Sequence, residues 1–235
     1  GVLTEFVNWR LDLMMLVGVA SSASVGLYAV ALRLADISSI MASSVGDALM
    51  PEVAAAEKAD EATRVVTRSL RLTLAAHLLI LMPLWIAAPY ILRFAYGVDF
   101  LPVTNVLRLL MVAAVAWSAG SIVISGLNGL GHPGLSAIAR IVAALVMVVA
   151  LRTWLPSRGI QGAALASITG YSVMFLVALF WLLRRRQVTL WECLRPRWED
   201  IPRSLGPTAL RDRVSRPAPR LAPRQTGEAL ITAAE

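Results

Sequence analysis

The stretch Ala163–Leu183, with the sequence AALASITGYSVMFLVALFWLL, decides the fold class, because it runs for 21 residues without a charged side chain. The hydrocarbon core of a bilayer is about 30 Å thick and is crossed by roughly 20 apolar residues in a helix. Three similar stretches precede it, at Leu74–Tyr90, Leu107–Ile124 and Ile138–Leu151. Two less purely apolar stretches come first, at about Val2–Ala20 and Val25–Met50. The sequence therefore predicts an all-α polytopic membrane bundle of six transmembrane helices.

The composition agrees with a membrane protein. Hydrophobic residues make up 57% of the chain and charged residues 16%, and the mean hydropathy is +0.68. In a soluble globular domain, about half of the residues are apolar and about a quarter are charged. A secretory signal peptide is not indicated, because the chain opens with GVLTEF and lacks a basic segment before its first apolar stretch. Since position 1 is Gly and not Met, we expect a fragment or a processed product.

The basic residues are distributed as membrane topology requires. Of 22 Lys and Arg residues, 11 lie at or after Arg184, so the calculated pI of 10.7 does not indicate nucleic acid binding. With a cytoplasmic tail and six spans, 16 basic residues lie on the cytoplasmic side and four on the other, leaving out Arg10 and Arg33 as intramembrane. Basic residues are retained in the cytoplasm, which predicts both chain ends there. The only cysteine, Cys193, excludes an intrachain disulfide.

Two domains are predicted, a transmembrane lobe over residues 1–186 and a tail over 187–235. The tail is rich in Arg and Pro, with six of the 12 prolines between Pro196 and Pro223, so it should be mostly disordered. The arginines at 184–186 either bind anionic lipid headgroups or only end the last span. Within the lobe, the sequence NGLGHPG at 128–134 predicts a tight cytoplasmic hairpin, with Pro133 near the start of the next helix.

Charged residues inside the second apolar stretch are candidates for function. On one helix, Asp36, Ser44 and Asp47 would lie within about 60° of Arg33 and extend over about 21 Å. An ionisable group at this depth costs about 2.5 kcal/mol or more, so it faces a bundle interior or a wet cavity. Two interpretations are open. Either Arg33 and Asp36 neutralise each other at i,i+3, or the four residues form the wall of a cavity.

Other polar residues lie on neighbouring stretches. Asp12 shares a helical face with Glu5 and Trp9, whereas Arg10 points elsewhere and must either find a partner on another helix or reach an interface. Ser118, Ser121 and Ser125 form a second polar row, which either lines the cavity or packs helices closely. His77, alone in an apolar run, is predicted to be buried or to bridge two helices.

An enzyme is not indicated. The sequence contains no convincing pair of catalytic carboxylates, nucleophile with a base, metal cluster or phosphate-binding Gly-rich loop. No cofactor and no metal ion are therefore predicted.

Several short patterns carry a family resemblance. They are Arg10-Leu-Asp12, Val25–Ala31 (VGLYAVA), Leu49–Ala54 (LMPEVA), Tyr96–Phe100 (YGVDF), Gly129-Leu-Gly131 and Gly159–Ala166 (GIQGAALA). In their order and spacing over Gly1 to about Arg186, these patterns resemble the carboxy-terminal half of bacterial polysaccharide-biosynthesis flippases. Those O-antigen-type transporters belong to the multidrug/oligosaccharidyl-lipid/polysaccharide exporter superfamily. The tail lies outside the resemblance.

The resemblance implies a function. Such proteins consist of two six-helix lobes around a cavity and move an undecaprenyl-diphosphate-linked oligosaccharide across the bacterial cytoplasmic membrane by alternating access. This chain would be the second lobe, and its partners would be the lipid-linked oligosaccharide, membrane lipids, and the missing amino-terminal lobe or a second copy. Arg33 and Arg10 would attract the diphosphate, while Asp12, Asp36 and Asp47 would position these arginines or couple to a cation. Alternatives are a cationic drug exporter or peptidoglycan-precursor flippase of the same superfamily, and a membrane-embedded glycan polymerase or ligase.

Overall fold

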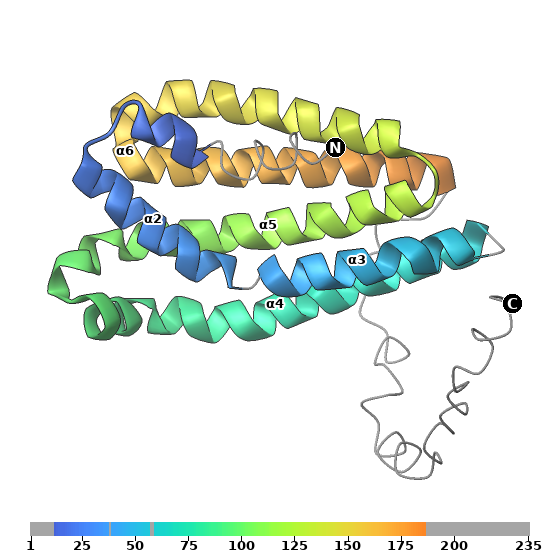
Figure 1. The fold of residues 1–235 in the computed structure, drawn as a ribbon, viewed down its shortest axis with the longest axis horizontal. Helices are drawn as coiled ribbons and strands as arrows, with labels where there is room; N and C mark the ends of the chain where they lie inside the picture. The colour runs from blue at the N-terminus through green and yellow to red at the C-terminus, as the bar shows by residue number, and fades with distance from the viewer. Residues whose placement is uncertain (1–11, 38, 57–58, 187–235) are drawn as a thin grey trace, which may run out of the picture. The chain divides into compact units, whose positions relative to one another are not determined.

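The computed structural model describes residues 12–37, 39–56 and 59–186, and these are almost entirely helical. Residues 12–17 form the first helical segment. The elements that follow are α2 (Ser22–Asp36), α3 (Ser39–Ala55), α4 (Ala59–Tyr96), the 3-10 helix η1 (Val98–Val103), α5 (Thr104–Gly129) and α6 (Pro133–Arg186) (Figure 1). The prediction of an all-α fold is confirmed, whereas the tail at 187–235 lies outside the described residues.

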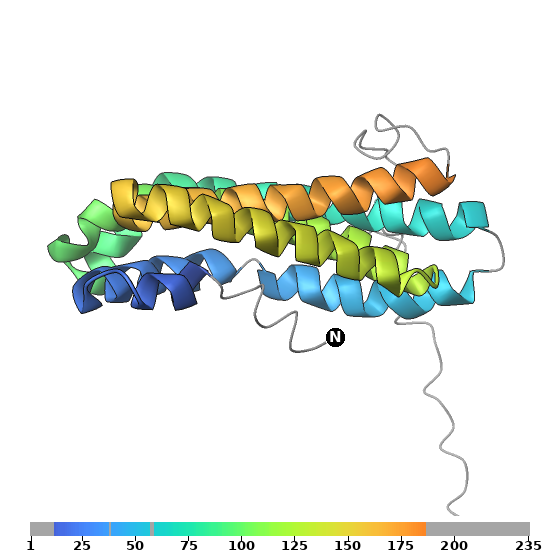
Figure 2. The same cartoon turned by 90° about the horizontal axis from the view of Figure 1, so that it is seen from above.

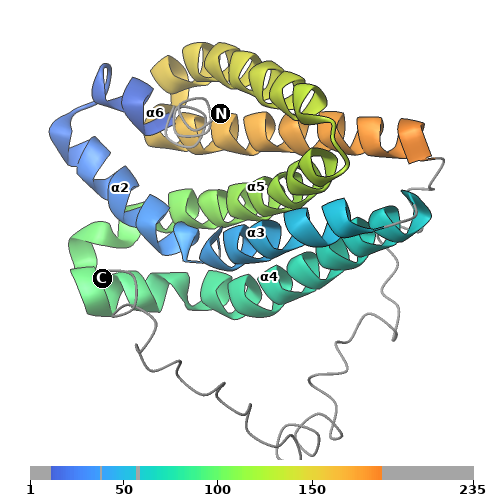
Figure 3. The same ribbon diagram turned by 45° about the vertical axis from the view of Figure 1, so that its right-hand side comes forward.

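Within the described residues, three helices are by length and composition able to cross a membrane: Asp60–Tyr96, Val98–Gly129 and Pro133–Arg184. In the most apolar part of the span that contains α5, 61% of the residues are buried inside the protein, whereas 17% are buried in the corresponding part of α4. Accordingly, α5 lies between α6 and the pair α3 and α4, and packs on all three (Figures 1 and 3). The centre of the bundle is therefore α5, and α4 presents much of its apolar surface outward.

The helix α6 reverses its direction at Gly159, so it consists of two antiparallel limbs (Figure 1). Gly159 has φ 56° and ψ −135°, a conformation that a residue with a side chain rarely adopts. Close by, a Cβ placed on Gly162 would collide with the backbone carbonyl group of Trp154. The two limbs contain the predicted stretches Ile138–Leu151 and Ala163–Leu183, and glycine lets them meet this closely.

The predicted hairpin at 128–134 is present between α5 and α6. The N–H of Leu130 donates to the Gly126 carbonyl over 2.9 Å, and the N–H of His132 donates to the Leu127 carbonyl over 2.9 Å. Gly131 has φ 76°, and Pro133 is the first residue of α6. Positive φ at the glycine and fixed φ at the proline explain why this sequence turns here.

The interpretation of Val25–Met50 as one helix is wrong. The helix α2 ends at Asp36 and α3 begins at Ser39, and the two follow each other along one side of the molecule (Figure 2). A β-branched isoleucine and serines at this point have low helix propensity, and serine hydroxyls compete for backbone hydrogen bonds. Consequently, the angles reckoned from Arg33 along a continuous helix do not apply to Ser44 and Asp47.

Prolines do not interrupt α4, which continues through Pro83 and Pro89. Each proline lacks an N–H, so the carbonyl four residues earlier loses its helical hydrogen bond. For Pro89, this carbonyl belongs to Trp85.

Candidate functional site

A hydrogen-bonded carboxylate is buried among the described residues. Asp12 is 0% exposed, and its Oδ2 accepts a hydrogen bond from the Tyr28 hydroxyl at 2.5 Å. The Ser167 hydroxyl lies 3.0 Å from the same oxygen and 3.1 Å from the Ala163 carbonyl, so its proton is shared between two acceptors. The other oxygen, Oδ1, accepts the N–H of Leu13 at 2.8 Å. These donors compensate for the burial of a carboxylate, which would otherwise be costly.

The Asp12 cluster, which we define as Asp12, Tyr28 and Ser167, ties together three elements. Asp12 belongs to the first helical segment, Tyr28 to α2 and Ser167 to the second limb of α6. Hydrogen bonds to a charged group contribute about 1.5–3 kcal/mol each. The cluster therefore fixes how the amino-terminal segment packs on the rest of the bundle.

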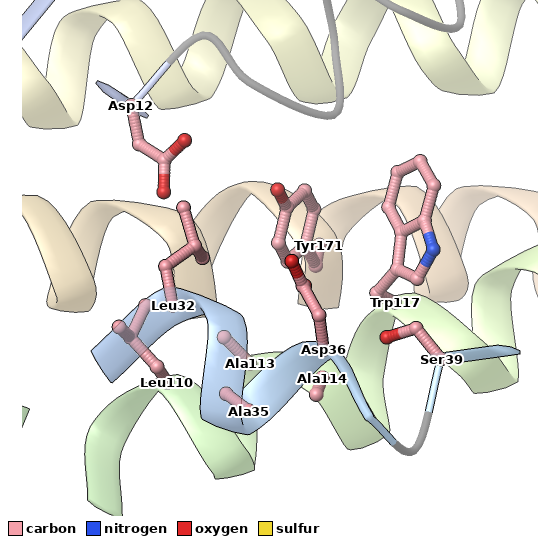
Figure 4. Close-up of a pocket in the computed structure, with 10 residues that line it drawn as sticks. All are labelled: Asp12, Leu32, Ala35, Asp36, Ser39, Leu110, Ala113, Ala114, Trp117 and Tyr171. Atoms are coloured by element: carbon pink, nitrogen blue, oxygen red, sulfur yellow. The ribbon is translucent and has the colours of Figure 1, made fainter. Parts of the chain in front are cut away.

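Beside this cluster is a small cavity of about 20 Å³. It is lined by Asp12, Leu32, Ala35, Asp36, Ser39, Leu110, Ala113, Ala114, Trp117 and Tyr171 (Figure 4). The carboxylates of Asp12 and Asp36 approach it from opposite sides in Figure 4. Trp117 and Tyr171 meet edge to face there, with ring centroids 5.0 Å apart. A cavity of this volume has room for about one water molecule, and its polar lining suits one.

The second group of predicted site residues is on the surface. Arg33, Ser44 and Asp47 are exposed, whereas Asp36 is half-buried at the cavity. The alternative in which Arg33 neutralises Asp36 is not realised, because Arg33 makes no ion pair with any residue that the structure describes. Only Asp36, of the four residues predicted to share a face, contributes to the cavity that holds Asp12.

The exposed side chains of α2 and α3 differ in kind from those of α4. Apart from Met50, which is 48% exposed, the exposed side chains of these two helices are mostly small or polar, and we use the term α2–α3 face for a set of them: Gly26, Arg33, Ser43, Ser44, Asp47, Ala48 and Pro51. The exposed side chains of α4, in contrast, are mostly large and apolar, with Leu79 at 77% and Phe94 at 97% exposure. Lipid chains favour the second kind of surface, whereas the first suits water or another protein.

His77 and Ser118 form a separate buried pair between α4 and α5. The Nδ1 of His77 lies 2.9 Å from the Thr73 carbonyl, and its Nε2 lies 2.8 Å from the Ser118 hydroxyl. A carbonyl only accepts, so Nδ1 carries the proton, and in the neutral ring Nε2 accepts from Ser118. The prediction that His77 is buried and bridges two helices is confirmed.

The serine row on α5 is divided between two environments. Ser118 is fully buried on His77 and does not line the cavity, while Ser121 and Ser125 are half-buried. The accompanying glycines pack helices: a Cβ on Gly120 would lie 2.6 Å from Met174, and one on Gly126 would lie 2.5 Å from Val66. Close helix packing is therefore the better interpretation of this row at Ser118.

Some of the predicted site residues lie outside the described part of the chain, and some residues of the observed site were not predicted. Arg10, Glu5 and Trp9 lie outside the described residues. Sequence reasoning did not identify Tyr28 and Ser167 as site residues. The signal that could have found them is that a buried carboxylate needs hydroxyl or amide donors from other helices. Among residues 12–186 as far as described, no three His, Cys, Asp or Glu side chains lie close enough together to hold a metal ion.

Comparisons of the chain with protein-family models, with curated proteins and with solved structures find no match.

Proposed function

We propose that this chain is one lobe of a membrane transporter that moves a lipid-linked oligosaccharide across the bacterial cytoplasmic membrane. The cargo of this proposal is an undecaprenyl-diphosphate-linked glycan for polysaccharide biosynthesis, as the resemblance of the sequence implies. The partner would be an amino-terminal lobe or a second copy of this chain.

The observation that carries the proposal is the contrast between the α2–α3 face and the outer face of α4. A helix bundle that only sits in lipid has no reason to expose Arg33, Ser44 and Asp47 on α2 and α3 while the large exposed side chains of α4 are apolar. Intramembrane charges of this kind are typical of walls that line a substrate path between two lobes.

The chemistry of the α2–α3 face suits an anionic cargo. Arg33 offers a planar guanidinium fork that matches phosphate oxygens, and no ion pair with another described residue occupies it. The cavity beside Asp12 is too small for a sugar, since pockets for small molecules measure about 300–1,000 Å³. The cargo would therefore travel along the α2–α3 face, and the Asp12 cluster would hold the lobe together during the movement.

The proposed topology has six passes and both ends in the cytoplasm. The α3–α4 connection, the α5–α6 hairpin and the end of α6 lie at the same end of the bundle (Figure 1). Arg64, Arg68 and Arg140 are near that end, and an excess of basic residues is typical of the cytoplasmic side.

Substitution of Arg33 tests the proposal. In cells that depend on the full-length protein for polysaccharide export, Arg33→Gln should lower export at least about tenfold, as expected for one lost charge-assisted contact. The matched control is Arg64→Gln, which removes the same charge from an exposed position of α4. Membrane abundance of each variant is measured by immunoblot. Normal export by an abundant Arg33→Gln protein would contradict the proposal.

A second candidate, an exporter of cationic compounds from the same superfamily, is favoured by the acids at the cavity. Asp12 and Asp36 both line it, and none of the described residues that line it is basic. A resistance assay against cationic dyes separates the two functions. Dye sensitivity of an Asp36→Asn variant together with normal glycan export would favour the second candidate.

A further inference from the structure

Arg108 on α5 is held in an unusual way against α4. Its Nε donates a hydrogen bond to the backbone carbonyl of Trp85 over 3.3 Å, and its Cζ lies 4.4 Å from the centroid of the Trp85 ring. The guanidinium therefore makes two interactions with Trp85, a hydrogen bond to its carbonyl and a cation–π contact with its ring.

Pro89 explains why this carbonyl is available. In a helix, the carbonyl of Trp85 would accept from the N–H four residues later, and the residue at that position is a proline without an N–H. An unpaired carbonyl in an apolar setting is costly, so Arg108 satisfies a group that the sequence of α4 leaves open.

Most of the guanidinium donors remain to be matched. Arginine has five N–H donors, and the Trp85 carbonyl takes one of them. Among the residues that the structure describes, no carboxylate pairs with Arg108. The surroundings are exposed and apolar, with Trp85 at 45% exposure and with Met82 and Ile86 also exposed on α4. A cation beside lipid chains is costly unless an anion meets it.

The position of Arg108 determines which anion can reach it. Arg108 lies four residues after the start of α5 at Thr104, about 6 Å from that end of the helix. Arg108 is also only one residue inside the predicted apolar stretch Leu107–Ile124, and the predicted stretch that carries Trp85 ends at Tyr90, so we take this position to be close to the headgroup layer, where phosphate diesters are the abundant anions. We propose that Arg108, held over the Trp85 ring, binds the phosphate group of a membrane phospholipid at the η1 end of α4 and α5. The site is independent of the transported cargo and depends only on the embedding of the apolar helices in a membrane.

Lipid binding to the purified full-length protein tests the proposal. Native mass spectrometry would count the lipids retained after addition of phosphatidylglycerol or of diglucosyl diacylglycerol, which has the same acyl chains and no phosphate. We expect phosphatidylglycerol to be retained and the glycolipid to be lost. Arg108→Gln should reduce phosphatidylglycerol occupancy about tenfold, because charge-assisted hydrogen bonds to the phosphate disappear.

The matched control is Arg93→Gln, which removes the same charge from an exposed position near the same end of α4. It should change occupancy less than twofold if the site, and not the bulk charge, binds the lipid. Equal losses from both variants, or equal retention of the glycolipid, would overturn the proposal. Displacement of the lipid by excess inorganic phosphate would also overturn it, since the site would then take a free anion.

A second pair of variants protects the test against misfolding. Arg108→Lys keeps the charge but lacks the planar fork, so it should fold and retain the lipid more weakly than the wild type. Trp85→Leu removes the ring while the backbone carbonyl remains, and it should also weaken retention. If both variants retained the lipid as well as the wild type, neither the guanidinium fork nor the Trp85 ring would contribute to lipid binding, which would contradict the proposal.

Discussion

Two buried polar clusters lie against α5, and they differ in charge. The Asp12 cluster contains a carboxylate, joins three elements and borders the cavity. The His77 and Ser118 pair is neutral in the hydrogen-bonding pattern described above, joins two helices and does not line that cavity. Burial is equally complete at Asp12 and Ser118, both at 0% exposure. The comparison teaches that a buried charge needs several donors from distant segments, whereas a neutral ring needs only one partner for each nitrogen.

Removal of the carboxylate should have the largest effect. Asp12→Ala leaves the hydroxyls of Tyr28 and Ser167 without their acceptor, so we expect the free energy of unfolding to fall by about 3 kcal/mol. Asp12→Asn keeps one acceptor oxygen and should cost about half as much. Denaturant unfolding in detergent micelles, followed by tryptophan fluorescence, measures both. The control Asp47→Ala changes an exposed carboxylate and should stay within about 0.5 kcal/mol of the wild type. If substitutions at positions 12 and 47 lowered the free energy of unfolding equally, the comparison of the two buried clusters would lose its basis.

Loss of one donor to the carboxylate should rank second. Tyr28→Phe leaves the buried carboxyl group of Asp12 with fewer hydrogen bonds, and we expect the free energy of unfolding to fall by about 2 kcal/mol. In the background of Asp12→Ala, the same substitution should cost little, because the partner is already gone. This double-mutant cycle in the unfolding assay isolates the pair. The control is Tyr90→Phe, which removes a hydroxyl from an exposed ring. Additive effects of the Tyr28 and Asp12 substitutions would show that the hydrogen bond does not stabilise the fold.

The neutral cluster should respond less. Ser118→Ala leaves the Nε2 of His77 buried without its partner, and a neutral hydrogen bond contributes about 1 kcal/mol. Ser121→Ala, on the half-buried side of the same helix, should cost less than about 0.5 kcal/mol. A loss at Ser118 as large as that at Tyr28 would mean that charge does not distinguish the two clusters.

The smallest effect is expected at Thr73, where a substitution should not lower the free energy of unfolding. Its hydroxyl is buried and has no hydrogen-bond partner in the described structure, although its carbonyl accepts from His77. Thr73→Val replaces the hydroxyl with a methyl group of similar shape, so the free energy of unfolding should stay equal or rise by about 1 kcal/mol. A clear decrease in the same unfolding assay would show that the hydroxyl has a partner in the membrane.

The elements that the sequence predicts well are those with local signals. The apolar stretches of α4, α5 and both limbs of α6, and the turn at 128–134, follow from hydropathy and from Gly and Pro at turn positions. The break between Asp36 and Ser39 was not predicted, because average hydropathy across Val25–Met50 hides a short change in helix propensity.

The site was predicted only in part, for a different reason. Asp12 was a candidate because a carboxylate does not belong in an apolar helix. Its partner Tyr28 is 16 residues away and Ser167 is 155 residues away, so helical periodicity carries no information about either contact. His77 was expected to bridge helices, but Ser118 was assigned to a serine row, since a row of serines gives no sign of which member meets a distant ring.

The 155 residues between Asp12 and Ser167 also set an order in time. A ribosome adds about 5–20 residues per second, so about 8–30 s pass between the synthesis of the acceptor and that of its last donor. Tyr28, only 16 residues from Asp12, is synthesised before Ser167 and can donate its hydrogen bond to the carboxylate during this delay. The amino-terminal segment thus cannot make all of its final contacts until the second limb of α6 has been synthesised. The first part of the chain to be made is therefore among the last to be fixed in the bundle.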